Sequence, residues 1–426
     1  MSSFSRYLVL LFPILLLQNI CASEQVNQKN GNKKTISDRD HIISLLDESK
    51  SNWYTNTEMS IKNASEALKI ARKIHNDTLI AQSWNHIGAS YYFLDVADSA
   101  FLYMKKSLDL NRSIGYTKGV AVAANNIGLI TDYLGNYNKS IHYYKLALKL
   151  ELELNNKDGI AASYLNIASV YYYMNRFEKA IEYMMNSLGI YKELKDSTGL
   201  LRCYTNIGNT YCDIGIYDMA KKYTSEALDL SRALHDRDLE PANLNNLGKI
   251  ACAEMNYSSA IEHYLKALEI ERQENDRWSE ANTMNNLAVL FTETGNYPQA
   301  LNNLDNAYAI AKKIKTKKLI SEIFETYSST YEKSGNYQMA LKYSRKHSNL
   351  KDSIYNANTQ KQIDNLEDES FYSQKKDLIS TESKNNKPER SRKILYFEAG
   401  MITFTVLTTA LLVGLIIFRR RKLLNS

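Results

Sequence analysis

One carboxamide returns along the chain once every 40 residues, as Asn126, Asn166, Asn206, Asn246 and Asn286. A carboxamide offers two N–H donors and an acceptor oxygen. Stacked about one helix diameter apart, these five residues, the asparagine ladder, could hold the main chain of an extended peptide. Alternatively, each could bond a backbone group of the next unit and set the pitch of the stack, since a buried amide needs a partner. The sequence leaves both hypotheses open.

The segments that carry these asparagines repeat with the same period. The triplet Asn126 to Gly128 recurs as Asn-Ile/Leu-Gly/Ala, and the apolar residues Ile141, Tyr144 and Leu148 lie on one face of a helix. Between the two helices stands a turn such as 135–137, Gly-Asn-Tyr, whose variants begin with Asn175, Gly215 or Met255 in other units. Gly or Asn there supplies the left-handed residue that ends a helix. Each unit is therefore predicted to be a helical hairpin.

Small residues favour close packing of the two helices in each hairpin. Gly128 lies on the first helix, and Ser140 or its mostly Ala equivalents lie on the second. One hairpin cannot bury its apolar face alone, so neighbouring hairpins must stack and share a core. The fixed period therefore predicts an all-α fold, an α-solenoid.

This pattern resembles the tetratricopeptide repeat family in its small residue, Gly-x-Tyr turn, alanine and Ala-Leu pair. The resemblance covers residues 41–356 and implies a right-handed superhelix of about eight hairpins. The period exceeds the family's usual unit, as in the subfamilies that include kinesin light chains and the Leu-Gly-Asn-rich spindle scaffolds. The first unit, from about His41, has a degenerate first helix, and the sixth is expected to begin near Arg237.

The resemblance also implies which residues line the concave groove and bind a partner. Similar asparagines in related scaffolds contact peptide main chain, which implies that role for the asparagine ladder. The other groove candidates are Asn125, Asn245, Asn285, Tyr92, Asp132, Tyr172 and Asn209. Lys249, which holds the repeat position of Asn209 in the next unit, is the only basic residue among the groove positions, so the groove lacks the Lys/Arg clamp of chaperone-binding relatives. A ligand that presents a C-terminal carboxylate is therefore disfavoured.

The two ends of the chain predict export and membrane attachment. Residues 1–23 combine Arg6, an apolar run and small residues, which is typical of a secretory signal peptide, and residues 24–40 form a polar leader that we expect to be disordered. Residues 357–393 are interpreted as a helical extension and a basic linker, and residues 394–418 as a transmembrane helix. Residues 419–426 would be a basic cytoplasmic tail, which leaves the repeat array outside the cytoplasm, in the periplasm.

Composition argues against nucleic-acid, metal and catalytic sites. The net charge of +6 comes from the linker and the tail, so the repeat array carries no basic stripe for phosphates. Cys203, Cys212 and Cys252 form no CxxC pair and are expected to be buried or groove-lining thiols. His86 occupies a ladder position and is interpreted as a polar substitute for asparagine. We therefore expect no cofactor, no metal ion and no enzymatic activity.

Two hypotheses for function follow. In the first, the protein is a single-pass membrane scaffold whose extracytoplasmic groove binds a peptide or protein. In the second, it is a sensory input that signals through its membrane helix to a separate cytoplasmic kinase or transcription regulator. The layout resembles that of bacterial sensory proteins with a tetratricopeptide array, a segment like Lys351 to Ile354 and one membrane helix.

Overall fold

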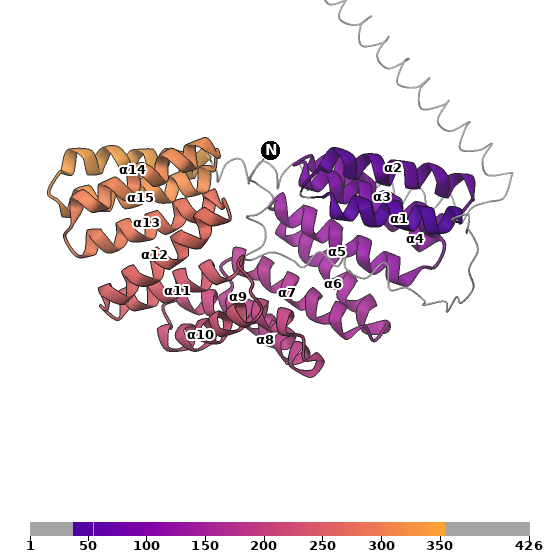
Figure 1. The fold of residues 1–426 in the computed structure, drawn as a ribbon, viewed down its shortest axis with the longest axis horizontal. Helices are drawn as coiled ribbons and strands as arrows, with labels where there is room; N and C mark the ends of the chain where they lie inside the picture. Colours follow the sequence, from indigo (N-terminus) through magenta and orange to yellow (C-terminus); the bar gives the residue numbers. More distant parts are fainter. Residues whose placement is uncertain (1–36, 54, 354–426) are drawn as a thin grey trace, which may run out of the picture. The chain divides into compact units, whose positions relative to one another are not determined.

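The structure, a computed structural model, describes residues 37–53 and 55–353, and every regular element in those ranges is a helix (Figure 1). The helices alternate between the first and second member of a hairpin, and residues 337–353 are helical up to the end of the described range. They are α1 (Asp38–Ser51), α2 (Thr57–Lys73), α3 (Asp77–Phe93), α4 (Ala97–Ser113), α5 (Thr117–Tyr133), α6 (Tyr137–Glu153), α7 (Lys157–Tyr173), α8 (Phe177–Leu194), α9 (Ser197–Asp213), α10 (Tyr217–Ala233), α11 (Glu240–Ala253), α12 (Tyr257–Gln273), α13 (Arg277–Glu293), α14 (Tyr297–Lys313) and α15 (Lys317–Lys333).

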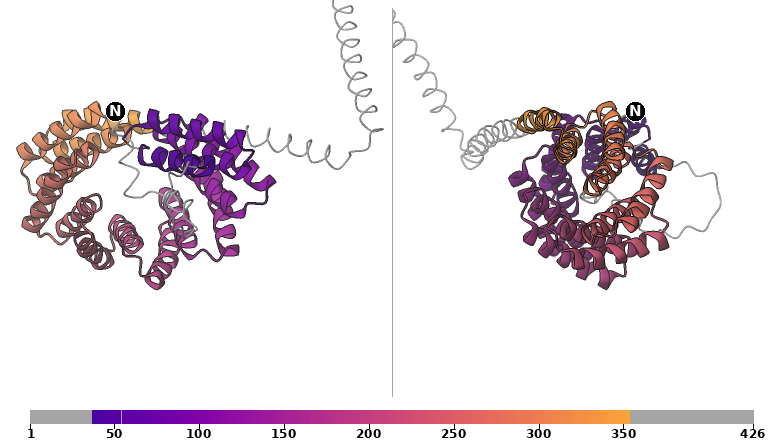
Figure 2. Two further views of the ribbon diagram at one scale, coloured as in Figure 1. Left: turned by 45° about the vertical axis from the view of Figure 1, so that its right-hand side comes forward. Right: turned by 90° about the vertical axis from the view of Figure 1, so that its left-hand side faces the viewer.

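The hairpins stack in chain order, which confirms the predicted all-α solenoid (Figures 1 and 2). Odd-numbered helices contact the odd-numbered helix of the neighbouring unit, as α9 contacts α11 and α13 contacts α15. Even-numbered helices bury one face only. In α4 the buried residues are spaced three or four apart and so lie on one face of the helix: Ala100, Met104, Ser107, Leu108 and Asn111. The apolar core therefore lies between a layer of odd-numbered helices and a layer of even-numbered helices.

Two helices begin where the sequence did not predict. The first starts at Asp38, within the expected leader, because the Ser37 hydroxyl accepts the N–H of Asp40 at 3.1 Å and caps the helix. Helix α11 starts at Glu240 instead of near Arg237. The Asp236 carboxylate accepts the N–H groups of Asp238 and Leu239 and holds the preceding residues in a turn.

A left-handed residue ends every helix that the structure describes between α2 and α15, at intervals of 20 residues. The predicted turn residues Gly135, Asn175 and Gly215 adopt this conformation, with φ between +55° and +76°. Met255 also adopts it, at φ +60°, although its side chain is 76% exposed and packs against little. Because L side chains disfavour this region, the turn geometry and not the residue type dictates the conformation at Met255.

The two helices of a hairpin approach each other at the predicted small residue. A Cβ atom added to Gly128 would lie 2.6 Å from Cδ1 of Tyr144, whose side chain is fully buried. The Ser140 hydroxyl, one helix away, donates to the carbonyl of Gly128 at 2.8 Å. In the next unit Ala168 replaces the glycine, and Met184 replaces the tyrosine. In these two units, the larger first-helix residue stands opposite the second-helix side chain without a ring.

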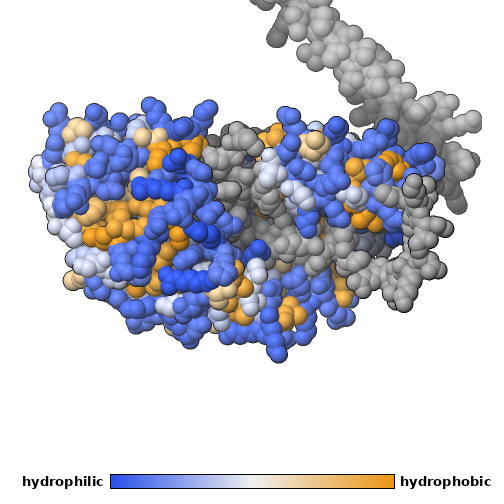
Figure 3. Space-filling model, viewed as in Figure 1, coloured by the Kyte–Doolittle hydropathy of each residue, from blue (hydrophilic) through white to orange (hydrophobic). Residues whose placement is uncertain are grey.

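The face of the protein seen in Figure 3 is largely hydrophilic, with apolar side chains gathered over α12 and α13. The exposed large apolar residues of these two helices are Leu265 and Val289. Within residues 37–53 and 55–353, no helix is both long and apolar enough to cross a membrane. The predicted signal peptide and the predicted span at 394–418 lie outside the described residues.

We expect Met255→Gly to stabilise the protein by about 0.5–1 kcal/mol, since glycine removes the left-handed strain at a modest cost in chain entropy. Thermal unfolding followed by circular dichroism measures the effect. The matched control is Met255→Ala, which keeps the Cβ atom and should give no gain. An equal gain for both variants would show that loss of the exposed side chain is responsible.

Substitution of Gly128 by Ala should destabilise the protein by about 1–3 kcal/mol, because the added methyl group meets the buried ring of Tyr144. The double variant Gly128→Ala/Tyr144→Met copies the next unit and should recover part of the loss in chemical denaturation. Gly189→Ala is the control: its Cβ would meet nothing within 4 Å in α8, so it should stabilise. If the Gly128 and Gly189 variants behaved alike, close approach would not be the cause.

Candidate functional site

Three members of the asparagine ladder bond an asparagine of the preceding unit. Asn126 donates from Nδ2 to Oδ1 of Asn85 at 3.1 Å, and Asn166 donates in the same way to Asn125 at 2.6 Å. Asn286 repeats the contact with Asn245 at 3.4 Å. The structure thus supports a structural role for these three residues. The partner, however, is a side chain of the preceding unit, where the sequence suggested a backbone group of the next.

The amide pairing fails wherever one of its two members is not asparagine. Asn206 faces the position of Leu165, and Asn246 faces that of Thr205, and within the described residues neither amide makes a side-chain hydrogen bond. The Thr205 hydroxyl is buried without a partner. At the last unit Thr326 replaces the ladder asparagine, and the buried Oδ1 of Asn285 has no donor. Buried polar atoms without a partner occur along the whole described array, and Thr205 and Asn285 are those that the interrupted pairing leaves in the C-terminal units.

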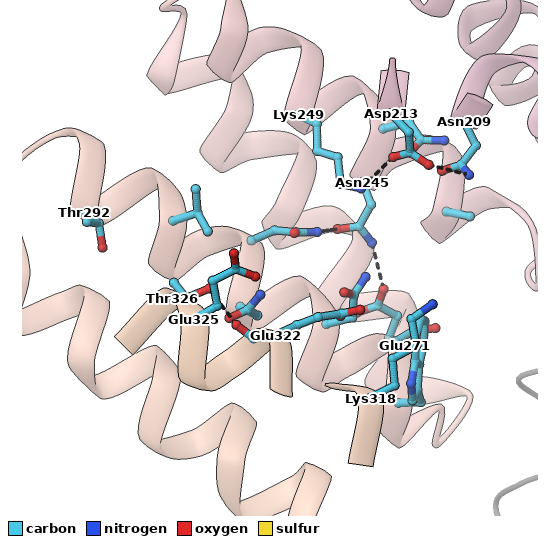
Figure 4. A pocket seen from close by; sticks show the side chains of 18 of the residues that line it. Asn209, Asp213, Asn245, Lys249, Glu271, Thr292, Lys318, Glu322, Glu325 and Thr326 are labelled. Carbon is cyan, nitrogen blue, oxygen red and sulfur yellow. Dashed lines mark hydrogen bonds and ion pairs between the residues drawn. The ribbon is translucent and has the colours of Figure 1, made fainter. Parts of the chain in front are cut away.

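Thr205, Asn246 and Asn285 line a cavity of about 640 Å³ between α9, α11, α13 and α15 (Figure 4). On α13 the lining residues follow one helix face, at Asn282, Asn286, Val289 and Glu293. The other odd-numbered helices present their equivalent faces. Six groove candidates line the cavity: Tyr172, Asn209, Asn245, Asn246, Asn285 and Asn286. Half of the groove candidates that the sequence suggested therefore line this one cavity.

The remaining candidates lie elsewhere. Asn206 is half-buried and is not among the residues that line the cavity. The other five are buried in the N-terminal units: Tyr92, Asn125, Asn126, Asp132 and Asn166. Burial raises the pKa of Asp132 to about 7. His86 is also buried there, its ring 5.4 Å from that of Trp53, and burial lowers its pKa to about 3, so it is neutral.

Sequence reasoning missed the charged residues of the cavity. Asp213, Glu271, Glu322, Glu325 and Lys318 all line it, and none of them was a groove candidate. Glu322 and Glu325 lie one turn apart on α15, where Thr326 replaces the ladder asparagine, so the repeat pattern did not mark this helix as part of the groove. Lys249, which was predicted, lies 3.9 Å from the carboxylate of Asp213.

Glu271 of α12 is the buried acid of this site, with 1% of its surface exposed. Its Oε1 accepts from Asn245 Nδ2 at 3.0 Å and from the Thr283 hydroxyl at 2.8 Å, whereas Oε2 has no partner. Burial raises the pKa of Glu271 to about 8, and the nearby charges of Asp276 and Glu280 act in the same direction. Glu271 is therefore mostly protonated at neutral pH.

The same repeat position shows why Oε2 is free. Three units earlier stands Glu151, also 1% exposed, whose Oε2 accepts from Asn156 at 2.7 Å. The residue equivalent to Asn156 is Asp276, which has no amide to donate and caps α13 through Ser279. With Asp276 in place of an asparagine, the donor for Oε2 is missing and a negative charge lies beside Glu271.

The chain matches the family profile for the tetratricopeptide repeat. The matches are overlapping and together run from residue 119 to residue 353, more than half of the chain: 119–193, 159–233, 199–273, 239–313 and 279–353. No curated protein matches.

Several solved structures share the fold. The apo form of the quorum sensor NprR from B. thuringiensis has a TM-score of 0.59 at 16% identity, over 72% of this chain and 87% of that chain. NprR in complex with its cognate peptide NprX gives 0.52 at 15% identity, over 72% and 88%. A Rap protein complexed with competence and sporulation factor gives 0.52 at 15% identity, over 74% and 99%. At these identities the likeness establishes a shared fold.

Glu271→Gln should remove a loss of stability at alkaline pH. A pKa raised from 4.5 to about 8 in the folded state stabilises the fold below pH 4.5, and this contribution disappears as the pH rises through 8. At pH 9 the variant should exceed the wild type by at least about 1 kcal/mol, with little gain at pH 5. Glu151→Gln, whose acid keeps its Asn156 donor, should show a smaller alkaline gain. Thermal melts from pH 5 to 9 measure the effect. If the melting temperatures of the wild type and Glu271→Gln changed in parallel with pH, Glu271 would not have a raised pKa.

Proposed function

The chain belongs to the tetratricopeptide repeat family, and from that premise we propose that it binds a peptide or protein partner in the cavity between α9, α11, α13 and α15. The observation that carries this proposal is the set of amides that the fold leaves unpaired at the cavity. Asn246 and Asn282 line it, and within the described residues neither makes a side-chain hydrogen bond.

Free amides on successive helices suit the main chain of an extended peptide. Each can donate to a carbonyl and accept from an N–H group of the ligand, so recognition need not depend on the ligand's side chains. Asn246 of α11 and Asn282 of α13 are the free amides. Asn286 of α13 and Asn209 of α9 also line the cavity, although Asn286 already donates to Asn245 and Asn209 to Tyr172. The groove of this half of the array thus offers a row of main-chain partners.

Two of the similar structures give this proposal indirect support. NprR was solved with its cognate peptide NprX, and a Rap protein with competence and sporulation factor. Both share the fold of this chain, and both hold a ligand. We propose the same kind of role, binding or regulation, for this protein.

A binding role also agrees with the chemistry of the thiols. Burial raises the pKa of Cys203 to about 12 and that of Cys212 to about 11, so neither is a ready nucleophile. Within the described residues no group of His, Cys, Asp and Glu side chains could hold a metal ion. We therefore propose binding, and not catalysis, as the activity of the cavity.

Location is a separate part of the proposal, and it rests on the sequence alone. The apolar segments within 1–23 and 394–418 favour export and a single membrane anchor, with the array in the periplasm. In that setting the protein would be a membrane-anchored scaffold or a sensory input that acts on a separate signalling protein. Accessibility of cysteines introduced near residues 30 and 424 to a membrane-impermeant reagent would distinguish the two sides of the membrane.

The binding proposal is tested by selecting phage-displayed random peptides on the full-length chain. The selected peptides should bind Asn246→Ala/Asn282→Ala at least about tenfold more weakly, the equivalent of about 1.4 kcal/mol, which two lost hydrogen bonds can supply. Calorimetric titration measures the dissociation constants, and melting curves check that the variant is folded.

The matched control is Asn306→Ala, which removes an exposed amide of α14 outside the cavity and should leave affinity unchanged. Selection of no peptide above a blank surface, or equal affinity for the wild type and the Asn246→Ala/Asn282→Ala variant, would overturn the proposal.

A further inference from the structure

We infer that the cavity receives a positively charged group of the bound peptide, the guanidinium of an arginine or the ammonium of a lysine. This inference rests on the proposed function and adds the chemistry of the ligand. It depends on two independent observations, the unpartnered acceptors of the cavity and its unpaired carboxylates.

The buried polar atoms that lack partners at the cavity are mainly acceptors. Oδ1 of Asn285 and Oε2 of Glu271 have no partner within the described residues, and the two side chains are only 8% and 1% exposed. In the neutral acid Oε2 carries the proton, because Oε1 accepts two hydrogen bonds, and it becomes an acceptor when Glu271 ionises. A buried acceptor without a hydrogen bond costs about 1–3 kcal/mol. A ligand rich in N–H donors would satisfy both atoms, whereas a carboxylate or phosphate would supply only more acceptors. Thr205, the third such residue, can donate or accept and favours neither class.

The charges of the cavity point the same way. Asp213 is paired with Lys249 at 3.9 Å, and Glu293 with Lys333 at 2.6 Å. Glu322 and Glu325 form no ion pair within the described residues, although the charges of Lys318 and Lys249 favour the ionised form of Glu322. The two carboxylates share one face of α15, since residues three apart are neighbours on a helix. Negative charge is therefore in excess where the peptide would lie (Figure 4).

Burial raises the pKa of two carboxyl groups of this site, so ligand binding is coupled to proton release. It raises the pKa of Glu322, and it raises that of Glu271 to about 8. Around Glu271 the other charged groups are Asp276 and Glu280, and Glu280 is already bound by Arg272 and Arg277. A cation beside a buried carboxyl group favours its charged form. Binding of a cationic peptide should therefore release protons and strengthen as the pH rises from 6 to 8.5.

The test uses three capped tripeptides on the full-length chain: acetyl-Gly-Arg-Gly-amide, its citrulline analogue and its glutamate analogue. Citrulline keeps the shape of arginine but has no charge. We expect the arginine peptide to bind saturably and at least tenfold more tightly than the citrulline peptide at pH 8, with a smaller ratio at pH 6. The glutamate peptide should bind most weakly. Ligand-observed NMR titration suits weak affinities.

Substitutions on α15 test whether the arginine side chain binds at Glu322 and Glu325. Glu322→Gln/Glu325→Gln should reduce affinity for the arginine peptide at least tenfold and leave the citrulline peptide unaffected. Glu332→Gln removes an exposed carboxylate of the same helix outside the cavity and should change neither. Melting curves of each variant establish that the fold is retained.

Equal affinities for arginine and citrulline, or no binding of the arginine peptide at millimolar concentration, would overturn the inference. Tighter binding of the glutamate peptide would do the same. The proposed function would survive these outcomes if selected peptides still lost affinity in Asn246→Ala/Asn282→Ala. If the selected peptides bound that variant as tightly as the wild type, the proposed function would be wrong as well. The two failures are therefore distinguishable.

Discussion

Equal helix length is the constraint on which the rest of this structure depends. Most helices have 17 residues, and a left-handed residue closes each turn at intervals of 20. Identical positions of successive units therefore face each other along the stack, and the amide of Asn126 meets that of Asn85 just as Asn166 meets Asn125. One inserted residue in a helix would rotate its face by about 100° and break every such contact beyond it.

With the backbone geometry repeated, the proposed binding site depends on which side chains occupy equivalent positions in successive units. Where asparagine meets asparagine, one amide donates to the other, as at Asn126 and Asn166, and each amide keeps one buried atom without a partner. Where Thr205 or Thr326 interrupts the pattern, a polar group is left without a partner, and the cavity lies at these interruptions. The same asparagine can thus be structural in one unit and available to a ligand in the next.

The fold could be predicted from the sequence because its determinants are local and repeated. Helical spacing, turn residues such as Gly135 and close contacts such as that of Gly128 all lie within one unit. The site could be predicted only in part, because its determinants are relations between units. Whether Asn246 is paired depends on Thr205, 41 residues earlier. Glu271 could not be predicted as a site residue, because the equivalent residues in neighbouring units are as different as Ser231 and Ala311. The position therefore has no repeated residue type.

That variation bears on what Glu271 does. Ser231 and Ala311 are fully buried at the same repeat position, so the packing of a unit does not require an acid there. Glu151 is an acid whose second oxygen is bonded, and it is satisfied within the fold. Glu271 alone of these four combines a buried carboxyl group, an oxygen without a donor and a place on the cavity wall. Burial of Oε2 without a partner costs stability in the free protein, and a cationic donor in the cavity would bind that oxygen in the ionised acid. A residue that destabilises the free chain and is satisfied only by a ligand is what a specificity-determining position requires.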